Sequence, residues 1–386
     1  MASSFELMQL GNVIRFGNGK AIKPGGIGRY PVFGSNGIIG NSDEFRYENG
    51  IIIGRVGAYC GSVGYCQKKF WASDNTLVAF PANDQFDTRF IFYLLHNANL
   101  GSYAGGAAQP LVTQTVLKQV EVKVPLLPIQ HRIASILSAY DELIENNQRR
   151  IRILEEMARS LYREWFVHFR YPGHESVPLV DSRLGQIPQG WAVKKLADLT
   201  SFLSRGLSPS YDDDGASLVI NQKCIRDQRL SLEPARRQKK PISEDKKVRF
   251  GDVLINSTGV GTLGRVAQVY SNLELCTVDT HVTIARSSES TDLDFFGCVL
   301  MSQQENFERL GVGATGQTEL GRAVIGQVEL ITPPNILQAR FGVLVRPMRV
   351  AATTLSSQTD NLRRTRDLLL PRLLSGQVQL EDAMIP

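Results

Sequence analysis

The chain has few of the residues on which most metal sites and disulfide frameworks depend. Five cysteines and five histidines occur in 386 residues, no two cysteines form a CxxC pair, and among the histidines only His168 and His174 are close in sequence. Neither a disulfide framework nor a metal site is therefore indicated, and we expect reduced thiols. No 18 apolar residues run together, and residues 1–10 lack the pattern of a signal peptide. We expect no membrane association and a cytoplasmic location.

Convincing nucleotide-binding motifs are also missing. Residues 259–264 and 311–316 both spell GxGxxG, but the first is followed by an alternating, strand-like run and the second lacks a strong preceding strand. Turn glycines explain both better than a dinucleotide site. We interpret Asp212–Gly215 as an exposed turn and Glu244–Lys247 as a solvated charge run. The sequence thus indicates no catalytic residue, bound metal or cofactor in this chain.

What the sequence does contain is the composition of a folded protein of two or three domains. Hydrophobic residues make up 42% and charged residues 21%, and 43 Lys and Arg against 38 Asp and Glu give a formal charge of +5. These are ordinary globular values for a chain of this length. The basic balance permits a polyanionic partner without requiring one.

The chain repeats once along its length. Residues 109–125 align without a gap with residues 317–333 at a shift of 208, and Gln130 then aligns with Gln338. Upstream, residues 53–57 match 255–259 at a shift of 202, and 10–13 match 196–199 at 186. The second copy therefore carries insertions. A period near 200 residues indicates two whole domains in tandem, because solenoid repeats are far shorter.

Each copy begins with a strand-rich region and ends in a long helix. Short β-type runs at 50–54, 76–80, 253–256 and 280–285 are bounded by Gly, Asn and Asp. After Pro128, apolar residues recur at alternating spacings of four and three, which is the seam of a coiled coil. The seam comprises Ile133, Leu137, Tyr140, Ile144, Asn147, Ile151, Leu154, Ala158, Leu161 and Trp165. Asn147 in this seam either specifies the register or lies at a wet edge.

The second copy ends in an equivalent helix. Adding 208 to the seam gives mostly apolar residues, among them Phe341, Val345, Leu355, Leu362 and Leu369. Pro347 removes a backbone donor, so we expect a kink or short break there, and Gly376 is a plausible stop. Residues 332–335 (TPPN) are interpreted as the start of this helix. Each helix alone would expose a long apolar stripe, so we expect the two to pack together, and antiparallel if a pseudo-two-fold axis relates the copies.

Basic and polar residues that could contact DNA occur in both copies. Lysine and arginine can neutralise phosphates, and Tyr, Ser, Asn and Arg side chains can read base edges. The candidates are Lys20, Lys23, Arg29, Tyr30, Ser35, Asn36 and Arg55 in the first copy, and Ser204, Arg205, Ser208, Asn221, Lys223, Lys239 and Lys240 in the second. Together these residues indicate DNA binding more strongly than any one of them does alone.

Several segments resemble the DNA-specificity subunit of type I restriction-modification systems. Residues 124–147 (VPLLPIQHRIASILSAYDELIENN) and 155–166 (EEMARSLYREWF) are similar to that family's central helix. Residues 368–376 (LLLPRLLSG) resemble its C-terminal end, 187–191 (IPQGW) the usual opening of a recognition domain, and 30–37 (YPVFGSNG) a common loop. The first copy departs from the pattern in lacking the opening Gly-Trp.

The resemblance implies an α+β fold with two target-recognition domains in tandem and two long helices packed as an antiparallel coiled coil. We expect recognition domains at 1–127 and 171–332, helices at 128–170 and 333–375, and a tail at 376–386. Each domain would read one half of an asymmetric double-stranded DNA target. The helices would set the spacer and dock two methyltransferase subunits.

The resemblance also implies where the chemistry would take place. The methyltransferase subunits would use S-adenosylmethionine, and motor-nuclease subunits would use ATP and Mg²⁺, so that this chain binds no cofactor of its own. Two alternatives remain from the residues alone. One is a catalytic DNA-modification enzyme with degenerate motifs, and the other is a coiled-coil scaffold that does not bind DNA.

Overall fold

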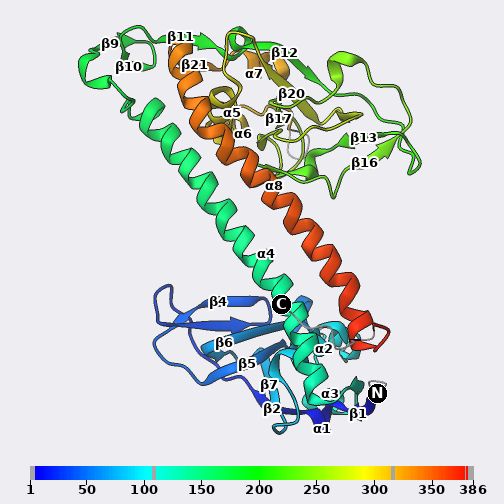
Figure 1. The fold of residues 1–386 in the computed structure, drawn as a ribbon. Helices are drawn as coiled ribbons and strands as arrows, with labels where there is room; N and C mark the ends of the chain where they lie inside the picture. Colours follow the sequence, from blue (N-terminus) through cyan, green and yellow to red (C-terminus); the bar gives the residue numbers. More distant parts are fainter. Residues whose placement is uncertain (1–4, 107–109, 314–317, 379, 381–386) are drawn as a thin grey trace. The chain divides into compact units, whose positions relative to one another are not determined.

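The computed structural model describes residues 5–106, 110–313, 318–378 and 380. The chain forms two compact units (Figure 1). Unit 1 combines Met1–Asn146 with Gln358–Pro386, and unit 2 is Asn147–Ser357. The boundary between the units therefore falls within each of the two long helices. The domain boundaries expected from the sequence lie instead at the two ends of each helix. No helix among the described residues is both long and apolar enough to cross a bilayer.

Unit 1 is built on a mixed six-stranded sheet. Successive isoleucines of its central strand point to opposite faces, as the two-residue period of a strand requires: Ile51 and Ile53 join the main core of the unit, and Ile52 joins a smaller aromatic cluster on the other face. All neighbours are antiparallel except β3 and β6. In spatial order the strands are β2 (Ile14–Asn18), β7 (Thr76–Pro81), β5 (Tyr47–Gly54), β6 (Val63–Ala72), β3 (Tyr30–Gly34) and β4 (Gly37–Ser42).

Short helices and a two-stranded sheet complete unit 1. The main core contains fully buried Phe90, Ile91 and Leu95 from the longest of these helices. Leu373 and Leu374, from the end of the chain's last helix, pack on the same cluster. The elements are β1 (Glu6–Gln9) paired antiparallel with β8 (Glu121–Val124), and the helices α1 (Leu10–Val13), α2 (Thr88–Asn97) and α3 (Gln114–Lys118).

Unit 2 contains a similar strand arrangement that is divided into two sheets. Its four-stranded antiparallel sheet runs β12 (Thr200–Arg205), β20 (Val282–Ser287), β17 (Val253–Asn256) and β18 (Val266–Gln268). The three-stranded sheet runs β16 (Arg236–Gln238), β13 (Ser217–Ile220) and β19 (Cys276–Val278). Its parallel pairing of β13 with β19 corresponds to that of β3 with β6 in unit 1. The two-stranded pairs are β9 (Leu179–Ser182) with β10 (Gly185–Pro188), β11 (Ala192–Lys195) with β21 (Glu329–Thr332), and β14 (Ile225–Arg226) with β15 (Arg229–Leu230).

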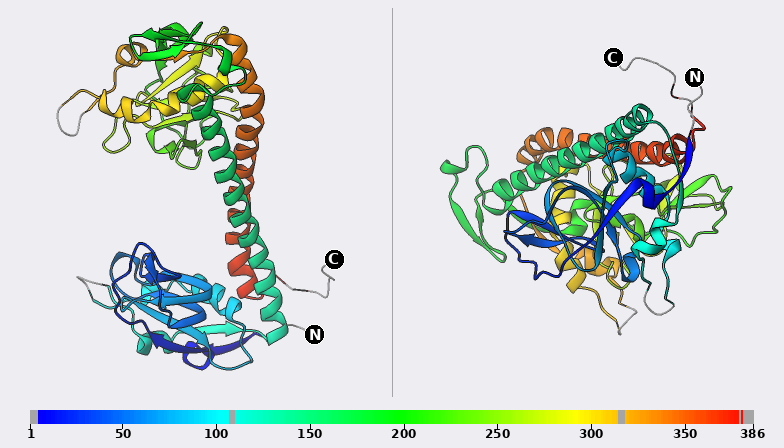
Figure 2. Two further views of the ribbon diagram at one scale, coloured as in Figure 1. Left: turned by 90° about the vertical axis from the view of Figure 1, so that its left-hand side faces the viewer. Right: turned by 90° about the horizontal axis from the view of Figure 1, so that it is seen from below.

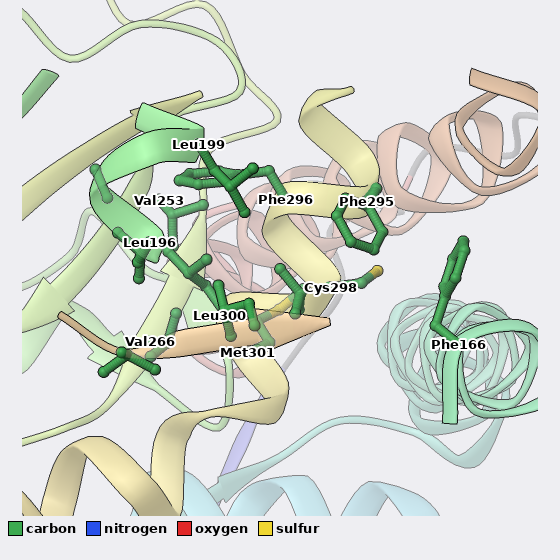
Figure 3. Packing of buried hydrophobic residues seen from close by; sticks show 14 of the residues in the cluster. Phe166, Leu196, Leu199, Val253, Val266, Phe295, Phe296, Cys298, Leu300 and Met301 are labelled. Atoms are coloured by element: carbon green, nitrogen blue, oxygen red, sulfur yellow. The ribbon is translucent and has the colours of Figure 1, made fainter. Parts of the chain in front are cut away.

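The main core of unit 2 is rich in aromatic rings. Phe295 lies 5.0 Å from Phe166 in an edge-to-face arrangement, and Phe166 lies 4.8 Å from Phe341. Figure 3 shows Phe295 turned toward Phe166, while Leu196, Leu199 and Val253 approach from the opposite side. Such pairs contribute about 0.5–1.5 kcal/mol each beyond their buried area. The helices of this unit are α5 (Leu293–Ser302), α6 (Gln304–Arg309) and α7 (Arg322–Gly326).

The two expected long helices are α4 (Leu127–Tyr162), which continues as a π-helical turn over Arg163–Val167, and α8 (Asn335–Leu374). In each unit a stretch of α4 lies beside a stretch of α8 (Figures 1 and 2). In unit 1, Asp141 of α4 pairs with Arg366 of α8 at 2.6 Å, and Ile133 shares a cluster with Leu373. Residue numbers thus rise along one helix as they fall along the other. The antiparallel direction expected from the sequence is confirmed, and contacts of Ile151 with Leu355 agree in unit 2.

The break expected at Pro347 is wrong. α8 is helical without interruption from Asn335 to Leu374. An interior proline costs a helix about 3 kcal/mol, but the two residues before Pro347 anchor the helix in unit 2. Val345 is fully buried in the core of unit 2, and Arg346 donates to Asp292 and Asp294. Tertiary contacts therefore override the local preference. Gly376, with φ +74°, lies just beyond the helix end, as expected.

The repeat is visible in equivalent hydrogen bonds. The buried amide of Gln130 accepts from the backbone N–H of Asp87 at 2.9 Å and donates to the carbonyl of Pro125 at 2.8 Å. Gln338 makes the same two bonds, to Asp292 at 3.1 Å and to Pro333 at 2.8 Å. Both aspartates cap the helix that follows, α2 and α5 respectively. The two copies are therefore built on one frame.

At one contact within that frame, the two units place the glycine on opposite sides. Gly11 of unit 1 lies against Lys118, and the equivalent positions of unit 2 place Ala197 against Gly326. A Cβ on Gly11 would lie 3.1 Å from that of Lys118, so unit 1 needs the glycine on one side of this contact, and unit 2 has it on the other. The first residues of the Gln109 and Gln317 alignment lie outside the described residues.

Several local predictions are confirmed. Gly259, Gly261 and Gly264 all have positive φ, and the strand β18 follows them, so this GxGxxG is a turn. The second GxGxxG extends beyond the described residues. The Asp212 side chain accepts from the N–H of Asp214, as in an exposed turn. Glu244 pairs on the surface with Lys247.

Candidate nucleic-acid interface

In unit 1 the backbone of Asn75 holds two of the predicted DNA-binding residues together. Its carbonyl accepts from the hydroxyl of Ser35 at 2.7 Å and from the backbone N–H of Arg55 at 2.9 Å. Ser35 and Asn36 form the two-residue turn between β3 and β4, and Arg55 directly follows β5. The guanidinium Nε of Arg55 is buried and has no hydrogen-bond partner among the described residues. The Ser35 side chain and the Arg55 backbone, 20 residues apart in the sequence, are thus held beside each other.

Two predicted cations of unit 1 lie near the end of β4 that is farther from this turn. The segment before β3 pairs with β4 through Gly25 and Asn41, which places Lys23 and Arg29 beside the edge strand of the sheet. Lys20 is exposed, and its backbone N–H bonds to Ala72 at the end of β6. The ring of Tyr30 lies 5.1 Å from that of Phe45.

A recess lies at the base of the β3–β4 turn. It measures about 240 Å³ and is lined by Ser35, Asn36, Tyr59 and Ser62 together with four glycines and three apolar residues. The hydroxyl of Ser62 donates to the carbonyl of Ser35 at 2.7 Å, so the turn is fastened from both sides. Tyr59 has 53% of its surface exposed. It was not among the predicted residues, because nothing in its sequence surroundings marks it.

In unit 2 the structure brings Ser208, Lys239 and Lys240 together. The ammonium of Lys240 donates to the carbonyl of Ser208 at 2.7 Å, and that of Lys239 lies 3.6 Å from the carboxylate of Asp212. The neighbouring guanidinium of Arg236 stacks on Tyr211, 3.7 Å from the ring centroid. These residues form a cationic surface on β16 and the 206–215 loop. The stacked pair was missed as a site, although Arg236 belongs to an obvious basic run.

The other predicted residues of unit 2 are engaged within the protein. Arg205 pairs with Glu319 at 2.7 Å and donates to the carbonyl of Leu320. Asn221 donates to the carbonyl of Pro234 and accepts from the N–H of Lys223, and Ser204 donates to the carbonyl of Arg205. The Lys223 side chain is exposed. The three lysines are exposed, whereas Ser204, Arg205 and Asn221 are half-buried, so unit 2 offers the lysines more readily to a ligand.

Electrostatics beside this surface are set by burial. Burial raises the pKa of Asp279, whose carboxylate accepts from the N–H of His281. Burial also raises the pKa of the Cys224 thiol to about 11 and of Cys276 to about 12, so both are thiols rather than thiolates near neutral pH. All five cysteines are free. In the described part of the chain, no three His, Cys, Asp or Glu side chains gather as metal ligands would.

The residues predicted to pack the two helices are all buried or half-buried. Asn147 has 7% of its surface exposed, so it lies inside the helix pair and not at a wet edge. Ile133, Leu137, Ile144, Ile151, Trp165, Phe341, Val345 and Leu355 are buried, and Tyr140, Leu154, Leu161, Leu362 and Leu369 are partly buried. Other apolar side chains of the helices face outward, among them Leu143, Ile153, Met157 and Val343.

Comparison with known proteins agrees with this architecture. Residues 3–156 match the family described as the type I restriction modification DNA specificity domain. The MjaIX specificity subunit of Methanocaldococcus jannaschii is 26% identical over 76% of this chain and 70% of its own. The HindI specificity subunit of Haemophilus influenzae is 23% identical over 75% and 77%. The crystal structure of the S subunit from M. genitalium superposes with a TM-score of 0.72, 17% identity and 96% coverage of both chains.

The repeated frame and the paired helices give this chain the fold of the S subunit of a type I restriction-modification system. Residues 3–156 match the type I restriction modification DNA specificity domain, and most of the chain is similar in sequence to specificity subunits of type I restriction enzymes.

Proposed function

We propose that this chain selects the DNA target of a type I restriction-modification complex, with each unit reading one half of a bipartite sequence. The observation that carries the proposal is the repeated frame with different loops. The Gln130 and Gln338 bonds match in the two units, but unit 1 presents the Ser35–Asn36 turn and unit 2 presents Lys239 and Lys240 directly after β16. Two readers of one ancestry but different surfaces select different half-sites, so the target is asymmetric.

The remaining activities belong to partners under this proposal. Two methyltransferase subunits dock on the outward faces of α4 and α8 and use S-adenosylmethionine. Motor-nuclease subunits use ATP and Mg²⁺. The complex works in the cytoplasm, and this chain sets the spacer between the half-sites with its helices. The candidate surfaces support the DNA contact because they combine phosphate-binding cations with side chains that can read bases.

The decisive experiment is co-expression with the methyltransferase subunit, followed by mapping of N6-methyladenine across the host genome. We expect a single split motif with a fixed spacer that disappears when this chain is deleted. Methyl transfer by the purified chain alone would instead support a modification enzyme. A stable complex with no motif and no salt-dependent duplex binding would indicate a scaffold.

A charge-neutralised variant tests the unit 2 surface. Lys239→Ala with Lys240→Ala removes two phosphate-binding charges, so we expect weaker binding to all duplexes. The slope of log affinity against log salt should fall by about 1–2, since each phosphate contact contributes about 0.9. Lys194→Ala with Lys195→Ala, an exposed adjacent pair on β11, is the matched control and should leave the slope unchanged. If the two double variants gave equal slopes, the surface next to β16 would not be part of the DNA interface.

A further inference from the structure

The β3–β4 turn of unit 1 presents an uncommitted amide beside exposed apolar side chains. Asn36 is exposed, and its side chain makes no hydrogen bond to any described residue. Ile38 and Ile39 follow it on the edge strand β4 with 63% and 44% of their surfaces exposed. Exposed isoleucines beside a free amide are not needed to fold a hairpin, so this arrangement points to a ligand.

The turn is held rigidly by its neighbours. Ser35 donates to the carbonyl of Asn75 and accepts, through its own carbonyl, from Ser62. Gly37 adopts φ +89°, which a residue with a Cβ rarely takes. Gly54 lies so close to Ser62 that a Cβ there would come within 2.3 Å of the hydroxyl. Asn36 is therefore presented in a fixed position, which lowers the entropy lost on binding.

The segment of chain that leads into and through the turn carries only positive charge. Residues 7–42 contain Arg15, Lys20, Lys23 and Arg29 and not one Asp or Glu. Gly28 packs against the backbone of Ser42, and Gly25 pairs with Asn41, so this acid-free segment lies along the same edge strand as Ile38. A surface of this kind suits a duplex, whose phosphates would meet the cations while its base edges meet the turn.

The chemistry of the two side-chain types selects a base pair. An asparagine amide can bond to N6 and N7 of adenine at once, and an apolar side chain packs on the methyl group of thymine. Both groups lie on the major-groove edge of an A·T pair. Ile38 lies two residues after Asn36, on β4, which begins directly after the turn.

We propose that the β3–β4 turn of unit 1 reads one A·T pair in its half-site, with Asn36 on the adenine and Ile38 on the thymine methyl group. This rests on the proposed function, since it assumes that unit 1 reads DNA. Asn36 is then a specificity-determining residue and Ile38 its apolar complement.

The test uses the full chain in complex with its methyltransferase subunit and duplexes carrying the mapped motif. 7-Deazaadenine replaces each adenine in turn and removes N7, and uracil replaces each thymine and removes only the methyl group. At one A·T pair of one half-site, wild type should lose affinity with both analogues, roughly 2- to 13-fold for the lost hydrogen bond to N7 and about fourfold for the methyl group. Asn36→Ala should be insensitive to 7-deazaadenine at that pair and Ile38→Ala insensitive to uracil there.

Two controls separate recognition from folding. Asn97→Ala at the exposed end of α2 and Leu7→Ala on β1 remove an amide and an exposed apolar side chain elsewhere in unit 1, and both should keep the wild-type response. Asn36→Asp keeps the shape of the side chain but lacks the N–H that adenine N7 needs, so it should lose the preference for adenine while melting like wild type.

The outcomes distinguish failure of the A·T assignment from failure of the proposed function. If wild type gives a split motif and the Asn36 and Ile38 variants respond to both analogues as wild type does, the A·T assignment is overturned and the proposed function stands. If Ile38→Ala weakens complex assembly and leaves DNA binding unchanged, this patch contacts protein, and the assignment is again overturned. If wild type selects no sequence, both proposals fail together.

Discussion

Single buried side chains determine how each helix begins. Gln130 and Gln338 have 1% of their surfaces exposed, and each satisfies a backbone N–H and a carbonyl that would otherwise be buried without a partner. A buried polar group left unpaired costs about 1–3 kcal/mol. These amides are therefore structural, although a glutamine in a sequence normally suggests an exposed position.

Removing either amide should destabilise its own unit. We expect Gln130→Ala and Gln338→Ala each to lower the free energy of unfolding by about 1–3 kcal/mol, because the Asp87 or Asp292 N–H loses its acceptor. Urea unfolding followed by circular dichroism measures this. Gln119→Ala, at an exposed position, should change stability by less than about 0.5 kcal/mol. Equal effects of the buried and exposed substitutions would refute the role given to the amides.

A second residue-scale prediction concerns pH. Burial raises the pKa of Asp279. A carboxyl whose pKa is higher in the folded than in the unfolded chain destabilises the fold above that pKa, and the penalty vanishes as the pH falls toward the unfolded value. Asp279→Asn keeps an acceptor for the His281 N–H and cannot ionise.

The Asp279→Asn substitution should therefore stabilise the protein relative to wild type near about pH 8 and lose that advantage near about pH 4. Urea unfolding of both proteins at the two pH values gives the difference, in which the other titrating groups cancel. An advantage of the same size at both pH values would show that charge burial is not the cause.

At the scale of elements, the long helices were the most predictable part of the fold and Pro347 the least. The heptad spacing is local information, so it identified α4 from its sequence. The proline was misjudged because its compensation comes from residues distant in sequence: Arg346 reaches Asp292 and Asp294, more than 50 residues away. Prediction of the DNA-binding residues was limited in the same way, because Arg205 pairs with Glu319, which is 114 residues away in the sequence.

An alanine at this position should strengthen α8. Pro347 is exposed and lies inside an unbroken helix, so Pro347→Ala restores a helical N–H donor without filling any space. We expect a gain of about 1–3 kcal/mol in the free energy of unfolding. Thermal and urea unfolding measure it. A loss of stability would mean that the ring itself makes a contact on which the helix depends.

At the scale of the molecule, the two units have separate main cores with equivalent centres. Phe90 and Phe295 are both fully buried and occupy matching positions in α2 and α5, three residues after a capping aspartate. Truncation to alanine of such a ring costs about 3–5 kcal/mol. The cost should stay largely within the unit that contains the ring.

Hydrogen exchange followed by mass spectrometry tests that separation. Phe90→Ala should accelerate exchange in β5, β7 and α2, whereas Phe295→Ala should accelerate it in β17, β20 and α5. Each variant serves as the control for the other. Equal acceleration in both units by either substitution would show that the molecule opens as a single cooperative body.

The glutamine bonds at the two helix starts also bear on how such a chain can change. The same bonds join each unit to the start of its helix, Gln130 with Asp87 and Pro125, and Gln338 with Asp292 and Pro333. Those contacts do not involve Ser35, Asn36, Lys239 or Lys240. A genetic exchange with crossovers at these junctions would replace one reader and leave its attachment intact, so a population of cells could acquire a new DNA address without having to evolve a new protein.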